Sequence, residues 1–124
     1  MTALDRLRPL RCPPPLRPGD TVAVVAPSGP VDPAKLHRGV AWLRTEVGLD
    51  VRLGRHVLDR GGHGLPFLAG RDEDRATDLQ EAWLDPAVAG VLCARGGDGA
   101  PRLVDRLDWH ALASVPPKLL CGLS

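Results

Sequence analysis

The residues that could carry chemistry are concentrated in three short turns that contain glycine. The last of them, Gly122-Leu123-Ser124, follows an apolar run of strand type. Gly-x-Ser at the end of a buried strand is the first half of a nucleophile elbow, a sharp turn that holds a serine hydroxyl at the top of a sheet. The same three residues are also ordinary turn formers, so the motif alone leaves a nucleophile and a simple turn both open.

A second segment, Arg95-Gly96-Gly97-Asp98-Gly99, could form an oxyanion hole. Adjacent glycines let the backbone come close to a substrate, and an outward N–H can stabilise a tetrahedral oxyanion. The alternative is a glycine turn that lets the following helix pack close to its strand. A dinucleotide-binding loop is disfavoured, because the spacing G-x-G-x-x-G would need glycine where Arg102 stands.

Two further polar residues are candidates. Ser28, in the turn Pro27-Ser28-Gly29, could contact a ligand or satisfy nearby backbone N–H groups. His63 lies in a glycine-rich loop over residues 59–70 and could act as a base, although loop histidines are more often solvated. Because a nucleophilic serine needs a base and an orienting group, and no spacing here supplies them, we expect the base of Ser124 to lie beyond this chain.

The elements that must position these turns follow from the hydrophobic pattern. Apolar runs predict strands at residues 21–26, 49–53, 88–94 and 118–122. Helical spacing of apolar residues predicts helices at residues 33–47, 72–84 and 100–107. The alternating second strand is expected nearer an edge, and the other three are expected to be buried.

This order of strands and helices predicts an α/β fold: a Rossmann-like (flavodoxin-like) three-layer domain with a mainly parallel sheet of about four strands, over residues 18–124. Residues 1–17 are rich in Pro and Arg and are expected to form an extended leader. Parallel strands place their carboxyl ends on one edge, where open α/β sheets bind ligands. All three turns are therefore expected at that edge.

Composition narrows the function classes. With 44% hydrophobic residues, 25% charged residues and a net charge of +1, the chain has no electrostatic footprint for nucleic acid or an anionic membrane. Three cysteines without a CxxC pair predict reduced thiols in a cytoplasmic protein, two of them in buried strands. The histidines show no zinc-binding spacing, so the sequence offers no zinc motif. The tryptophans are interpreted as packing residues.

Five sequence blocks, taken together, resemble the N-terminal domain of the LD-carboxypeptidases, serine peptidases that include muramoyltetrapeptide carboxypeptidases and microcin C immunity peptidases. The blocks lie in residues 16–31, 67–79, 93–103, 107–109 and 117–124. Their order and separations are those of the family.

The resemblance implies that Ser124 is the nucleophile of a Ser-Glu-His triad and that the Gly97 N–H belongs to the oxyanion hole. It implies release of terminal D-Ala from murein tetrapeptide through a serine acyl-enzyme, with neither a metal nor an organic cofactor. Ser28, Gly96 and Asp98 would contact this small peptide substrate; many family members carry an aromatic residue in place of Asp98. The triad Glu and His belong to a C-terminal domain, so the 124-residue chain is expected to be inactive and to self-associate. The rival interpretation is a non-catalytic α/β binding or interaction domain.

Overall fold

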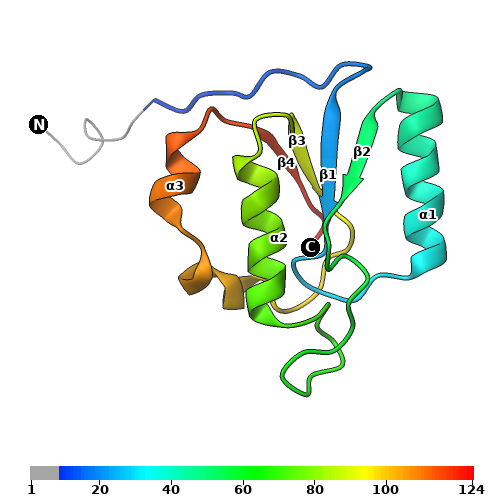
Figure 1. Cartoon of the computed structure of the whole chain (residues 1–124), viewed down its shortest axis with the longest axis vertical. Helices are drawn as coiled ribbons and strands as arrows, with labels where there is room; N and C mark the ends of the chain where they lie inside the picture. Colours follow the sequence, from blue (N-terminus) through cyan, green and yellow to red (C-terminus); the bar gives the residue numbers. More distant parts are fainter. Residues whose placement is uncertain (1–8) are drawn as a thin grey trace, which may run out of the picture.

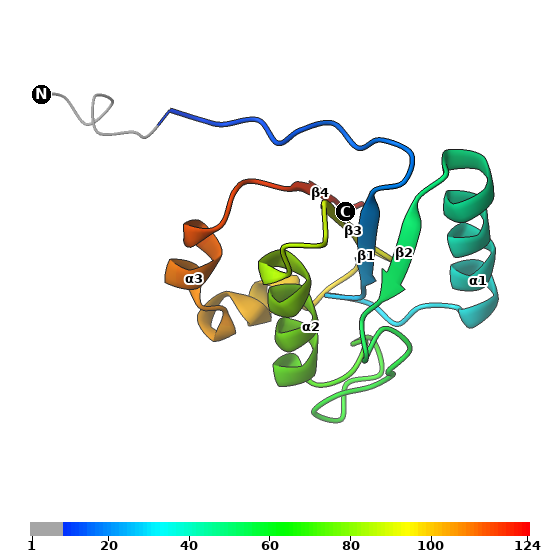
Figure 2. The same cartoon turned by 45° about the horizontal axis from the view of Figure 1, so that its top comes forward.

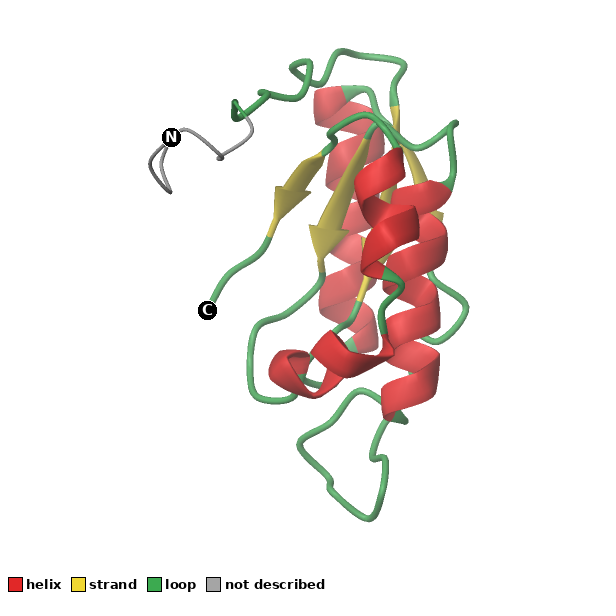
Figure 3. Cartoon of the chain, turned by 90° about the vertical axis from the view of Figure 1, so that its left-hand side faces the viewer, coloured by secondary structure: helices red, strands yellow, loops and turns green. Residues whose placement is uncertain are grey.

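Four parallel strands form one sheet in the computed structural model, which describes residues 9–124. The strands are β1 (Thr21–Val25), β2 (Asp50–Leu53), β3 (Gly90–Cys93) and β4 (Leu119–Cys121). Their order across the sheet is β2-β1-β3-β4, and each neighbouring pair is parallel. Figure 3 shows the arrows of the sheet pointing the same way. The predicted parallel α/β sheet of four strands is therefore confirmed.

Helices cover both faces of this sheet. The α-helices are α1 (Pro33–Trp42), α2 (Asp72–Leu84) and α3 (Trp109–Ser114). A π-helical turn, η2 (Leu43–Val47), extends α1, and a 3-10 helix, η3 (Ala100–Arg106), precedes α3. Figures 1 and 2 show α1 on one side of the sheet and α2 with α3 on the other. This arrangement is the predicted three-layer fold.

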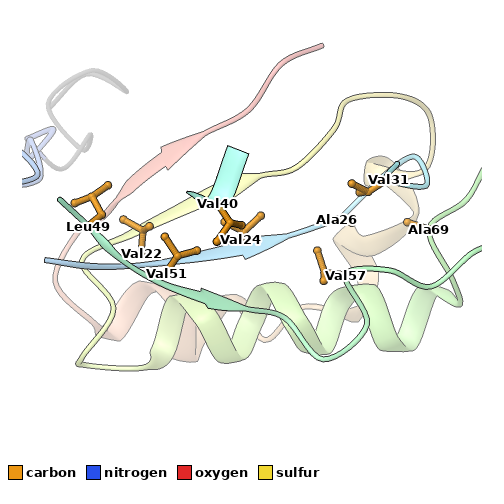
Figure 4. Close-up of a cluster of buried hydrophobic side chains, with 9 residues drawn as sticks. All are labelled: Val22, Val24, Ala26, Val31, Val40, Leu49, Val51, Val57 and Ala69. Carbon is orange, nitrogen blue, oxygen red and sulfur yellow. The ribbon is translucent and has the colours of Figure 1, made fainter. Parts of the chain in front are cut away.

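Strand β1 is buried on both faces, as expected for a central parallel strand. Val22 and Val24 belong to a cluster on the α1 side, which also contains Val40 of α1 and is drawn in Figure 4. Ala23 and Val25 belong to a second cluster on the α2 side. The alternation of side chains along the strand thus gives the sheet a core on each face.

The first helix has typical start and end residues, Asp32-Pro33 and Gly48. The Asp32 carboxylate accepts hydrogen bonds from the backbone N–H groups of Ala34 (2.8 Å) and Lys35 (3.2 Å), and Pro33 occupies the first turn. Gly48 ends the helical segment with a φ of 78°, the left-handed conformation usual for a glycine stop. The helix therefore begins and ends where its residues indicate, although its last turn is π-helical.

The fourth strand differs from its prediction. Residues 118–122 were expected to form a buried strand, yet Leu119, Leu120 and Cys121 are all exposed, and Cys121 is not a buried thiol. The physical reason is that β4 is an edge strand, paired within the described residues only with β3. An apolar run of this kind is typical of a buried strand, but burial also requires a covering neighbour.

The segment after β3 also differs. A single amphipathic α-helix was expected over residues 100–107, whereas the structure has the 3-10 helix η3 followed by the short helix α3. Asp108 starts α3, because its carboxylate accepts a hydrogen bond from the N–H of Ala111 (3.0 Å). Two tryptophans expected to pack are more than half exposed, Trp42 (58%) and Trp109 (56%).

Residues 9–17 contain no helix or strand and run past the amino-terminal edge of the sheet (Figure 1). Only Leu16 of this segment packs against the cluster on the α1 side. The first half of the expected leader, residues 1–8, lies outside the described residues. Among the helices of residues 9–124, none combines the length and the apolar character that crossing a bilayer requires.

Candidate active site

The turns that follow β1, β3 and β4 meet at the carboxyl edge of the sheet. The backbone N–H of Gly97 donates a hydrogen bond to the backbone oxygen of Ser124 across 3.2 Å. Gly97 also faces Gly29, since a Cβ placed on Gly97 would lie 3.4 Å from the Gly29 nitrogen. The three sequence segments singled out for chemistry therefore come together in space.

Glycine is required at Gly96 by this close approach. A Cβ at this position would overlap the carbonyl oxygen of Leu123 in the turn that carries Ser124. On its other side, the Gly96 carbonyl oxygen would lie 2.9 Å from a Cβ at Gly29. Backbone packs directly on backbone between these turns, so no side chain intervenes between the Gly96-Gly97 pair and Ser124.

Ser124 has an unusual backbone conformation. Its φ is 56°, in the left-handed region that residues other than glycine rarely adopt. Its side chain is exposed, and within residues 9–124 its hydroxyl makes no hydrogen bond to another side chain. The hydroxyl is thus accessible, but the described residues supply it with no base.

Ser28 and Asp98 differ in their exposure. Ser28 is buried (5% exposed), and its carbonyl accepts a hydrogen bond from the N–H of Ala69 across 2.9 Å, which ties the glycine-rich loop to the turn after β1. Asp98 is exposed beside Gly97, and its carboxylate forms no ion pair with any residue in the range 9–124. Asp98 is therefore free to meet a solute at the edge, whereas Ser28 is screened from solvent.

A buried arginine of α2 lies beneath the turns. Arg75 is 1% exposed and donates hydrogen bonds to three backbone carbonyls, those of Pro27 (2.6 Å), Gly99 (3.1 Å) and Gly70 (3.2 Å). Its guanidinium also pairs with the carboxylate of Asp72, one turn earlier in the helix. The arginine thus connects the turns after β1 and β3 with the end of the glycine-rich loop.

The charges of this network compensate one another. Burial lowers the pKa of Arg75, and the negative charge of Asp72 opposes that effect. A side-chain hydrogen bond from Arg102, with Nε 3.0 Å from the Asp72 carboxylate, lowers the pKa of Asp72. Asp72 therefore remains ionised between two guanidinium groups.

Neither Arg75 nor Asp72 was predicted as a functional residue from the sequence. A signal is present in the sequence, because apolar Ala76, Leu79 and Trp83 recur at helical spacing within the predicted helix at residues 72–84. Positions 72 and 75 continue this face at helical spacing. An arginine on a buried helix face requires partners, and backbone carbonyls of adjacent turns are suitable ones.

His63 of the glycine-rich loop and His56, just before that loop, both lie close to the start of α2. His63 Nε2 accepts a hydrogen bond from the backbone N–H of Asp72 (3.1 Å). His56 Nδ1 lies 2.9 Å from the Asp59 carboxylate, and with Asp74 these residues form a group whose possible metal-ligand atoms all lie within 4.8 Å. Neither histidine contacts Ser124, so within the described residues His63 is not placed as its base.

A cavity lies beside this edge. It has a volume of about 670 Å³ and runs between α1 and β3, with Leu36, Val40 and Leu92 among its apolar walls. Arg95 reaches its rim, where its guanidinium donates a hydrogen bond to the Pro30 carbonyl (2.9 Å). Gly96, Gly97 and Ser124 do not line this cavity, and Gly97 and Ser124 are exposed.

Comparison with known proteins identifies the family. The family described as "LD-carboxypeptidase N-terminal domain" matches residues 22–124. A curated carboxypeptidase homologue of Streptomyces coelicolor is 52% identical over 120 residues, which are 97% of this chain and 37% of the homologue. The murein tetrapeptide carboxypeptidase of Pseudomonas aeruginosa is 37% identical over 103 residues, 83% of this chain and 32% of that protein.

A solved structure supports the same assignment. The crystal structure of an MccF-like protein from Bacillus anthracis superposes with a TM-score of 0.79 at 30% sequence identity, over 90% of this chain and 33% of that one. The chain thus spans about a third of the length of the relatives that it matches. Fold and sequence agree: the chain belongs to the LD-carboxypeptidase family and carries its N-terminal domain.

Proposed function

We propose that this chain contributes the nucleophile, Ser124, and one oxyanion-hole amide, that of Gly97, to a serine peptidase. The peptidase would release terminal D-Ala from murein tetrapeptide by hydrolysing its L,D-amide. The observation that carries the proposal is the 3.2 Å contact between the Gly97 N–H and the backbone of Ser124 at the carboxyl edge of the sheet. The name and 37% identity of the Pseudomonas aeruginosa relative support the substrate class.

The proposed reaction proceeds through an acyl-enzyme. The Ser124 oxygen attacks the carbonyl carbon of the scissile amide, while a base takes the hydroxyl proton and passes it to the leaving nitrogen of D-Ala. Water then hydrolyses the ester on Ser124 and releases the shortened peptide. By family resemblance, the base is a His oriented by a Glu, both in the C-terminal domain, so the 124 residues alone would be inactive or nearly so.

The oxyanion role sets a geometric requirement. An oxyanion donor must lie about 2.7–3.1 Å from the developing negative charge. The Gly97 N–H donates to the backbone of Ser124 in the structure, so substrate binding must replace that hydrogen bond with one to the substrate oxygen. Exposed Asp98, next to Gly97, and Gly96 would then contact the peptide close to the reacting carbonyl. Ser28 is buried in this structure, so it is proposed to contribute to the site from beneath the turn after β1 and not from an open surface.

The test is D-Ala release from L-Ala-γ-D-Glu-meso-diaminopimelyl-D-Ala by the complete gene product that contains these residues. We expect Ser124→Ala to lower kcat by roughly 10⁴-fold or more, as removal of the nucleophile does in other serine hydrolases. Ser114→Ala is the matched control, because Ser114 ends α3 and its hydroxyl only donates to the Ala111 carbonyl. Equal activity of the Ser124→Ala variant and the unmodified protein would exclude Ser124 as nucleophile.

A further inference from the structure

Arg75 connects the two turns that would form the oxyanion side of the site. We propose that Arg75 is a positioning residue: it fixes the distance between the turn after β1 and the turn after β3 and thereby directs the Gly97 amide. This inference rests on the proposed function, because the position of Gly97 matters only if its amide binds the reacting oxygen.

One nitrogen atom makes the connection. Arg75 Nη1 donates to the carbonyl of Pro27 at 2.6 Å and to the carbonyl of Gly99 at 3.1 Å. Pro27 immediately precedes Ser28, and Gly99 lies two residues after Gly97. Because the guanidinium is planar and rigid, two carbonyls bonded to one of its nitrogens are held at a set separation.

The remaining donors fix the guanidinium itself. Nε donates to the Gly70 carbonyl at 3.2 Å, and Nη2 pairs with the Asp72 carboxylate. Asp72 is in turn held by Arg102 from η3, the helix that follows the turn after β3. The guanidinium is therefore anchored from α2 and η3 and cannot turn without breaking these contacts.

Packing alone does not account for a charged residue at this position. A buried ion pair is often no more stabilising than apolar side chains of the same volume. Arg75 has a fully buried side chain, and its charge could be dispensed with if only the space had to be filled. An apolar residue could fill the space, but it could not bind three carbonyls from three separate loops and so hold those loops in a fixed arrangement.

Substitution of Arg75 by lysine separates the effect of the positive charge from the effect of the guanidinium geometry. Arg75→Lys keeps the positive charge, but a single ammonium group cannot reproduce the planar fork that reaches Pro27, Gly99 and Gly70 together. We expect it to lower kcat for D-Ala release by about 10- to 100-fold with little change in KM, because small displacements of catalytic groups have effects of this size.

The experiment compares variants of the complete gene product at a temperature at which circular dichroism shows each to be folded. Val91→Ala is the control, because Val91 is fully buried in β3 and its loss destabilises the core without touching the guanidinium. We expect Val91→Ala to retain its kcat. An unchanged kcat for Arg75→Lys would overturn the positioning role. A loss of kcat in Val91→Ala as large as that in Arg75→Lys would overturn it too.

A second variant, Gly99→Ala, tests the same inference if Arg75→Lys does not fold. In Gly99→Ala the new Cβ would lie 3.1 Å from Arg75 Nη1 and 2.5 Å from Leu68 Cδ2, so it disturbs the same bridge from the other side together with the packing of Leu68. We expect Gly99→Ala also to lower kcat, and Gly64→Ala, where nothing lies within 4 Å of the new Cβ, to leave it unchanged. Full kcat for Gly99→Ala would overturn the inference.

Ser124→Ala separates this inference from the proposed function. If Ser124→Ala keeps full activity, the proposed function is wrong whatever the Arg75 variants do. If Ser124→Ala is inactive while Arg75→Lys keeps full kcat, only the positioning role is wrong.

Discussion

Replacing Gly99 by alanine should destabilise the chain more than an ordinary glycine substitution in a turn. Gly99 has a φ of 110°, which L side chains rarely adopt, and such backbone strain costs about 1–3 kcal/mol. The new Cβ would also lie 2.5 Å from Leu68 Cδ2, and Leu68 is fully buried. Forcing that side chain aside costs about a further 1–3 kcal/mol. The expected loss in free energy of unfolding is therefore about 2–6 kcal/mol.

Gly64→Ala is the matched control for the steric part of this loss. Gly64 also has a positive φ, 73°, but nothing lies within 4 Å of the Cβ position. Only the backbone strain remains there, about 1–2 kcal/mol. Urea denaturation of the 124-residue chain, followed by circular dichroism, gives both values. Equal unfolding free energies for the two variants would refute the steric argument at Gly99.

Three further predictions follow from individual side chains. Burial raises the pKa of Asp78, so the folded state binds its proton more tightly than the unfolded state, and stability falls as pH rises from the ordinary value of 3.8 through the raised pKa. The free energy of unfolding of Asp78→Asn, measured by urea titration, should therefore increase relative to that of the original chain as pH rises. A difference between the two proteins that does not change with pH would contradict this. Burial also raises the pKa of the half-buried Cys93 thiol, which should react with a disulfide reagent more slowly than the two exposed cysteines; three equal rates would contradict this. Leu120 is 54% exposed on edge strand β4, so the chain should self-associate in sedimentation experiments. The substitution Leu120→Lys should reduce this self-association. Strictly monomeric behaviour of both the original chain and the Leu120→Lys variant would contradict the prediction.

The central part of the fold could be predicted because its signals are local. Apolar runs marked the strands, and Asp32-Pro33 and Gly48 marked the ends of the first helix segment. Once the strands are parallel, their carboxyl ends share an edge, so the meeting of the three turns follows from topology. The Gly96-Gly97 turn therefore lies at the predicted edge of the sheet, although none of its residues indicates in the sequence which other turn it will contact.

The exposure of β4 and the role of Arg75 could not be predicted in this way. An apolar strand has the same composition whether or not a neighbour covers it, so residues 118–122 could not reveal that β4 lies at an edge. Arg75 acts through carbonyls of Pro27 and Gly99, which are 48 and 24 positions away in the sequence. Backbone carbonyls have no sequence signature, and only their arrangement in space explains why an arginine is buried there.

The most direct measurement of the proposed active site is a crystal structure of the Ser124→Ala gene product with the intact murein tetrapeptide bound. The proposed function predicts the scissile carbonyl carbon next to the Cβ of residue 124 and its oxygen about 2.7–3.1 Å from the Gly97 nitrogen. It also predicts that the hydrogen bond from Gly97 to the backbone of residue 124 is broken in the complex. A peptide bound with its scissile carbonyl out of reach of Gly97 would contradict the assignment of these turns as half of the active site.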